Sequence, residues 1–264
     1  MNDKKTTGQK RSEVQSTPQA SSGKLAAVPF TSVQVDDAFW APRIEVNRRV
    51  TLPMEYQQCK TTGRIDAWTW KKGQPDEPHI FWDSDVGKWI EAVAYSLMTH
   101  PDKALEKKID AVVSMMSSAQ DKDGYLNSHF QLVEPLKRWS NLRDSHELYC
   151  AGHLMEGAVA YYQATGRRKF LEVMCRYADY IAQVFGPKKG QKRGYCGHPE
   201  VELALVKLFR TTGMQRYLDL AKFFVDERGR QPHYFDVEAK ARGEQATPWK
   251  TGQYSYFQAH QPLR

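Results

Sequence analysis

A chain of 264 residues with 41% hydrophobic side chains is long enough to bury one large core or two small ones. Its formal charge of +7 suggests nucleic-acid binding, but the excess is confined to residues 1–24 and the loop 188–193. The rest of the chain is close to neutral and has no basic stripe, so we expect no nucleic-acid partner.

Residues 1–27 are rich in Ser, Thr, Gln and Lys, a composition that predicts a disordered polar tail. This segment lacks the apolar run of a signal peptide, and no stretch of the chain reaches the ~18 apolar residues of a membrane span. We therefore expect a cytoplasmic location without a membrane partner, and one folded unit over residues 28–264.

The folded part is expected to begin near Val28, with a short extended segment over residues 32–35. A helical pattern then runs from about Phe39 to residue 60, and Gly63 is a suitable C-cap. Beyond it, apolar residues recur with a period of 3.6 and predict six more helices. They cover residues 86–98, 104–119, 154–164, 170–185, 201–210 and 217–227.

A weak internal repeat joins these helices in pairs, because residues 160–171 resemble residues 207–218. Each copy predicts a helix, a Thr-Gly stop, a short turn and a second helix. Stacked hairpins of this kind favour an all-α toroid, an α/α barrel, over a tetratricopeptide array, whose repeats are shorter and more regular. Six hairpins would close such a toroid and about three are evident, so the sequence predicts an incomplete barrel.

The segment 144–153 places two imidazoles, two carboxylates and a thiol at the start of a predicted buried helix. Such groups are costly to desolvate, so a fold that needed only a core would avoid them. His146 could contact a substrate or carry protons, or it could be satisfied by local capping bonds, since Asp144 and Ser145 are N-cap residue types. His153 is expected to be a packed core residue.

Two other histidines occupy similar settings. His198 lies on a constrained loop between glycine and proline, and His260 precedes a proline by two residues. We predict that His146, His198 and His260 contribute to one polar pocket. Glu200 and Glu202 are interpreted as helix-start residues, because carboxylates suit the positive N-terminus of a helix.

Other candidates have plainer interpretations. Asp83 and Asp85 could serve glycoside hydrolysis or a metal, although a capping role at the next helix is favoured. Tyr125 follows a turn and could line a central cavity. An aromatic content of 12% is compatible with a sugar site but is only weak evidence for one, because large helical cores use the same residues. No CxxC pair occurs among the cysteines, which are expected to be free thiols: Cys59, Cys150, Cys175 and Cys196.

Taken in order, several motifs resemble those of glycoside hydrolase family 127, the β-L-arabinofuranosidase family. They lie at residues 39–43, 61–66, 83–92, 123–126, 144–153, 197–205 and 259–264. The resemblance implies a six-hairpin α/α barrel followed by β-sandwich domains. It also implies removal of terminal L-arabinofuranose from plant-type glycans with retention of configuration.

By motif, the family histidines that contact arabinose correspond to His146, His198 and His260. In the family a zinc-bound cysteine is the nucleophile, further ligands are a glutamate and two adjacent cysteines, and a separate glutamate is the acid/base. These positions would lie beyond Arg264, so the resemblance assigns neither a catalytic residue nor a metal ligand to this chain. Zinc is implied for the full-length family, and no cofactor is expected for the fragment.

The resulting expectation is the N-terminal part of the catalytic domain, without its C-terminal part and its β-sandwich domains. Alone, the chain is predicted to be inactive and to expose apolar helix faces through which it self-associates. Two alternatives remain open. One is a non-catalytic carbohydrate-binding fragment, and the other is a helical-hairpin scaffold that binds protein partners.

Overall fold

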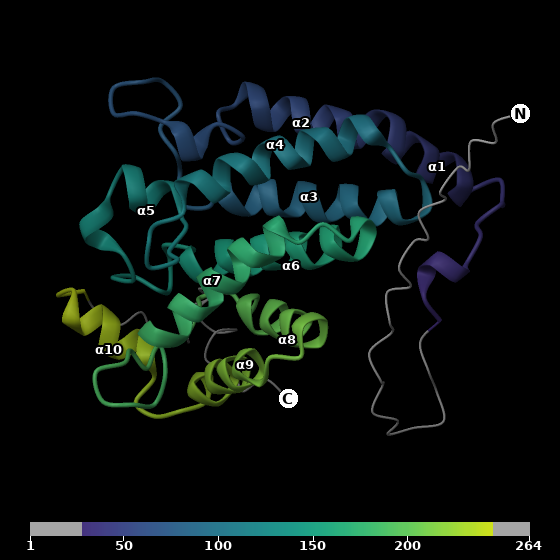
Figure 1. The fold of residues 1–264 in the computed structure, drawn as a ribbon. Coiled ribbons are helices and arrows are strands. Elements are labelled where there is room, and N and C mark those ends of the chain that lie inside the picture. Colours follow the sequence, from purple (N-terminus) through teal and green to yellow (C-terminus); the bar gives the residue numbers. More distant parts are fainter. Residues whose placement is uncertain (1–27, 245–264) are drawn as a thin grey trace, which may run out of the picture.

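The computed structural model describes residues 28–244, and within them the chain forms helices and no strand (Figure 1). The α-helices are α1 (Trp40–Val46), α2 (Leu52–Thr61), α3 (Trp82–Thr99), α4 (Lys103–Ala119), α5 (Ser128–Leu132), α6 (Glu147–Thr165), α7 (Lys169–Val184), α8 (Val201–Thr212), α9 (Gln215–Arg228) and α10 (Tyr234–Ala241). Shorter helical turns are η1 (Phe30–Ser32), η2 (Asn47–Thr51), η3 (Ala67–Thr69) and η4 (Pro135–Lys137). The predicted polar tail and His260 lie outside the described residues.

All the helices predicted from apolar periodicity are present. The largest difference is at α6, which begins at Glu147 rather than near residue 154, because its polar first turns hide the apolar pattern although much of that stretch is buried. The short helices α5 and α10 were not predicted. The expected extended segment over residues 32–35 begins inside η1, and Val33 has extended backbone angles (φ −112°, ψ 128°) without pairing in a sheet among the described residues.

The helices succeed one another as three hairpins: α3 is joined to α4 by a short turn, α6 packs on α7, and α8 packs on α9. In one layer, α6 packs against α3 and α8; in the other, α7 packs against α4 and α9. Figure 1 shows α6 lying between α3 and α8. This two-layered succession of hairpins is an arc of an α/α barrel, as the sequence repeat predicted.

The core follows the predicted apolar faces. In α3 the periodic residues from Val86 to Leu97 are buried, while α6 is buried around most of its circumference because it contacts both neighbouring hairpins. The α3 and α6 backbones meet at two glycines, and a Cβ on Gly157 would lie 2.8 Å from the carbonyl oxygen of Gly87. None of the helices between residues 28 and 244 is long and apolar enough to cross a bilayer.

The repeat is reproduced in atomic detail at the ends of α6 and α8. Each helix ends in threonine followed by a left-handed glycine, Gly166 (φ 73°) and Gly213 (φ 72°). The Thr165 hydroxyl donates to the Tyr161 carbonyl at 2.7 Å, and the corresponding Thr212 hydroxyl donates to a carbonyl one turn earlier at 2.8 Å. These matching stops turn each hairpin in the same way.

Candidate functional site

The structure brings His146 and His198 together at the start of α6. His146 is the N-cap of α6 and adopts a left-handed conformation (φ 61°), and His198 lies on the loop before α8. The two loops cross closely, because the Gly197 amide donates to the Leu142 carbonyl at 3.0 Å and a Cβ on Gly197 would overlap the Arg143 carbonyl oxygen. As a result the imidazole centroids are 5.2 Å apart.

Aromatic rings surround this histidine pair. The Tyr149 ring lies 5.6 Å from His146 and 5.3 Å from His198, measured between centroids. Phe81, which is partly exposed, lies 6.0 Å from His146 on another side. Lys88 donates to the Tyr149 hydroxyl at 2.8 Å. Polar groups of different segments thus converge on a half-buried, aromatic surface.

Both imidazoles are held neutral at physiological pH. Burial lowers the pKa of His146, an effect that the Asp144 carbonyl opposes and the nearby His198 reinforces. Burial also lowers the pKa of His198, helped by the positive charges of Arg228 and Lys88. His146 Nδ1 lies 2.5 Å from the Asp144 carbonyl oxygen, so Nδ1 carries the proton and Nε2 is left as an acceptor.

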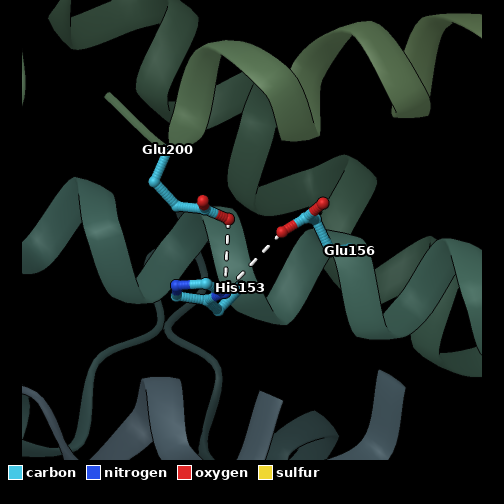
Figure 2. Close-up of side chains that lie close together, drawn as sticks. All are labelled: His153, Glu156 and Glu200. Carbon is cyan, nitrogen blue, oxygen red and sulfur yellow. Dashed lines mark ion pairs between the residues drawn. The ribbon is translucent and has the colours of Figure 1, made fainter. Parts of the chain in front are cut away.

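A second polar cluster lies between α6 and α8, and Figure 2 shows His153 facing the carboxyl groups of Glu156 and Glu200. His153 Nδ1 is 3.2 Å from Glu200 Oε1 and 3.6 Å from Glu156 Oε2. Burial, and secondly Lys88, lower the pKa of His153 to about 4. Burial, and secondly the neighbouring Glu156 carboxyl group, raise the pKa of Glu200 above its usual range.

The expectations for these residues are partly corrected. His153 is largely buried, as predicted, but it faces carboxyl groups as well as packing on Tyr149 at 4.5 Å. Glu200 is the N-cap of α8, as expected for a helix-start residue, yet its side chain makes no capping bond. Glu202 lies in the first turn of α8 and pairs with the buried Arg228 at 3.0 Å.

Asp83 and Asp85 neither cap α3 nor face each other as a catalytic pair would. No side-chain bond caps α3, whose N-cap is Phe81. Asp83 is buried and accepts bonds from the backbone and hydroxyl of Ser128, at 2.8 and 2.5 Å. Asp85 pairs instead with Arg64 at 2.7 Å. Their partners lie in distant segments, which local spacing could not indicate.

Glu147 was present in the polar segment but received no role from the sequence. It is buried and accepts bonds from the Tyr125 hydroxyl and the Trp139 amide, each at 2.6 Å. Burial raises its pKa to about 8, although these two bonds oppose the shift. Tyr125 is itself fully buried, so it forms part of the core rather than the wall of an open cavity.

The described cysteines do not fit the zinc–thiolate centre that the resemblance implies for the full-length family. Burial raises the pKa of all four thiols, to about 12 for Cys196 and well above the usual value for Cys150. A cysteine that ligates zinc or attacks an anomeric carbon acts as a thiolate, which these environments disfavour. No group of three metal-ligating side chains within residues 28–244 includes a cysteine.

These features define the class: an α/α-barrel protein in which a neutral histidine pair and aromatic rings converge at the start of α6 and just before α8. The sequence model of a protein family, the β-L-arabinofuranosidase GH127 catalytic domain, matches residues 32–264 of this chain. This chain therefore belongs to glycoside hydrolase family 127.

Relatives agree with this assignment. A non-reducing end β-L-arabinofuranosidase of Bifidobacterium longum subsp. longum is 42% identical over 197 residues, covering 72% of this chain and 30% of its own length. The solved GH127 β-L-arabinofuranosidase Ara127N of Geobacillus stearothermophilus T6 is 48% identical with a TM-score of 0.81, covering 87% of this chain and 38% of that one. A second solved GH127 β-arabinofuranosidase is 36% identical with a TM-score of 0.73, covering 89% and 42%. The chain thus spans less than half the length of each.

Proposed function

We propose that this chain supplies the sugar-holding part of a retaining β-L-arabinofuranosidase, and that His146 and His198 contact a terminal L-arabinofuranose. The observation that carries the proposal is the half-buried imidazole pair, 5.2 Å apart beside Tyr149. The substrate class is supported by the family and by relatives named as β-L-arabinofuranosidases. His260 stays a predicted third contact.

Neutral imidazoles suit this task because a neutral ring carries one donor nitrogen and one acceptor nitrogen, either of which can bond to a sugar hydroxyl. His146 gives its Nδ1 proton to the Asp144 carbonyl, so its Nε2 would accept from a hydroxyl. A site built to hydrogen-bond a hydroxyl discriminates against sugars that lack it, since its polar atoms would otherwise remain unpaired. The histidine pair would therefore fix the orientation of the sugar ring.

Cleavage of the glycosidic bond is not assigned to residues 28–244. Asp83 and Asp85 are engaged with Ser128 and Arg64, and the thiols are held protonated. We therefore propose that the 264-residue chain binds arabinofuranosides without hydrolysing them. The zinc ion and the acid/base glutamate that the family resemblance implies stay predictions for full-length members of the family.

The proposal is tested by titrating the 264-residue chain with methyl β-L-arabinofuranoside in a calorimeter. His146→Ala and His198→Ala should each weaken binding about tenfold, because a lost hydrogen bond is worth about 1–1.5 kcal/mol. The matched control is His100→Ala at the exposed end of α3, which should bind as the unaltered chain does.

Equal affinity of all three variants would refute the assignment of the histidines. A second assay supplies p-nitrophenyl β-L-arabinofuranoside to the unaltered chain, and no release of nitrophenol is expected. Sustained turnover would show instead that this chain carries the catalytic groups.

A further inference from the structure

The cluster of His153, Glu156 and Glu200 is a candidate site that the sequence analysis did not assign. His153 and Glu156 lie one turn apart on α6, and Glu200 approaches from the start of α8 (Figure 2). We propose that these three side chains bind a divalent transition-metal ion of the Zn²⁺ type between α6 and α8. One imidazole and two carboxylates are a donor set that suits such ions.

The spacing of the donor atoms fits a tetrahedral ion. Ligand atoms at about 2.0–2.2 Å from Zn²⁺ are separated from one another by roughly 3.2–3.6 Å. His153 Nδ1 lies 3.2 Å from Glu200 Oε1 and 3.6 Å from Glu156 Oε2, and the three atoms all lie within 4.8 Å of one another. A small rotation of one carboxyl group would bring the Glu156 and Glu200 oxygens to the same separation. The fourth coordination position of the ion would then be taken by water.

Two of these atoms also lack well-directed hydrogen bonds. Within the described residues, His153 Nδ1 and Glu200 Oε1 are shielded from solvent and face each other at 3.2 Å without the geometry of a hydrogen bond. Burying a polar atom without a hydrogen bond is costly, and an ion placed between these two atoms would use a lone pair of each. This observation is independent of the donor types and points to a ligand in the cluster.

Two ammonium groups lie near the cluster, and neither bonds to His153 Nδ1, Glu156 Oε2 or Glu200 Oε1. Lys207 bonds to Glu156 through Oε1, leaving Oε2 directed at His153, and it also reaches Glu91 at 3.3 Å. Lys88 is bonded to the Tyr149 hydroxyl. A lysine on the outer oxygen of a ligating carboxylate fixes its orientation, as outer-shell partners of metal sites do.

A glycine allows the two helices to share the site. A Cβ on Gly152 would lie 2.7 Å from Glu200 Cγ and 3.1 Å from the backbone of Val201, so a larger residue would push the start of α8 away from α6. Tyr149 packs on both His153 and His198, so an ion bound to His153 would also help to hold the Tyr149 ring in place beside the histidine pair.

The test is calorimetric titration of Zn²⁺ into the metal-stripped 264-residue chain, without sugar. We expect one equivalent to bind and the melting temperature to rise. His153→Gln and Glu200→Gln should each weaken binding by more than the roughly 10–100-fold that loss of an outer-shell partner costs. The two substitutions lie on different helices, and circular dichroism establishes that each variant is folded.

Imidazoles and thiols elsewhere in the chain could also bind Zn²⁺. The control is therefore the His146→Ala/His198→Ala double variant, which should still bind one equivalent of Zn²⁺. Co²⁺ bound in place of Zn²⁺ should give a spectrum without sulfur-to-metal charge transfer. Three results would each overturn the proposal: no Zn²⁺ binding, unchanged Zn²⁺ binding in folded Glu200→Gln, or loss of Zn²⁺ binding in the double variant. If no Zn²⁺ binds, the remaining explanation of the cluster is a proton shared by Glu156 and Glu200. Because no sugar is present in this titration, its outcome is independent of whether the chain binds arabinofuranosides.

Discussion

At the residue scale, the start of α6 combines a histidine that faces the candidate sugar site with a carboxyl group that faces inward. His146 is half-buried beside His198, whereas the next residue, Glu147, is buried and joins Tyr125 to the Trp139 backbone. The inward group therefore holds the loop before α6 against the core. This division explains why the buried helix α6 begins with polar residues.

Glu147 should make stability depend on pH. Its pKa is about 8 in the folded chain, against 4.5 for an unburied glutamate, so between these values the folded state holds a proton that the unfolded state has released. The free energy of unfolding should therefore fall as pH rises through this window, by at most about 1.4 kcal/mol per pH unit.

The measurement is urea unfolding of the unaltered chain and of Glu147→Gln between about pH 5 and pH 8, because the glutamine cannot ionise. As pH rises, the free energy of unfolding of the unaltered chain should fall steadily relative to that of Glu147→Gln. Glu172→Gln, on the exposed surface of α7, is the control. Parallel curves for Glu147→Gln and the unaltered chain would contradict the prediction.

At the element scale, the contact of α3 with α6 depends on the absence of side chains where the two backbones meet. Gly157→Ala should destabilise the fold by about 1–3 kcal/mol, because the new Cβ would lie 2.8 Å from the Gly87 carbonyl oxygen in a packed core. This cost opposes the gain of up to about 1 kcal/mol that alanine brings to an ordinary helix interior.

Thermal and urea unfolding of Gly157→Ala measure this effect. Ser118→Ala, on the exposed face of α4, should change stability by less than about 0.5 kcal/mol. A Gly157→Ala chain as stable as the unaltered one would show that α3 and α6 can separate without loss.

At the scale of the whole molecule, the helices near the start of the described chain expose large apolar side chains. Trp40 is 60% exposed, Met54 57%, Val50 50% and Ile44 43%. Large apolar side chains left exposed on successive helices favour association. Sedimentation velocity should therefore show the 264-residue chain forming larger species as its concentration rises.

The double substitution Trp40→Lys/Met54→Lys should shift the chain towards monomer, since it places charge on this surface without touching the buried core. The exposed Lys122→Ala in the turn after α4 serves as the control and should associate as before. A monomer at every concentration would refute the prediction.

The long helices, their succession as hairpins and the candidate histidines could be predicted from the sequence, because these depend on local information, whereas the short helices α5 and α10 could not. A period of 3.6 marks each buried face, and the Thr-Gly stops at Gly166 and Gly213 reappear with the same backbone geometry. Family motifs then associated His146 with His198.

Which side chains meet depends on the tertiary fold and could not be predicted from local patterns. His146 and His198 lie side by side because Gly197 crosses the loop at Arg143, Asp83 reaches Ser128, and Glu200 faces His153 across two helices. Each contact joins segments far apart in the chain, and its energy depends on burial that no local pattern records. For that reason a glutamate expected only at a helix start belongs to the proposed metal site.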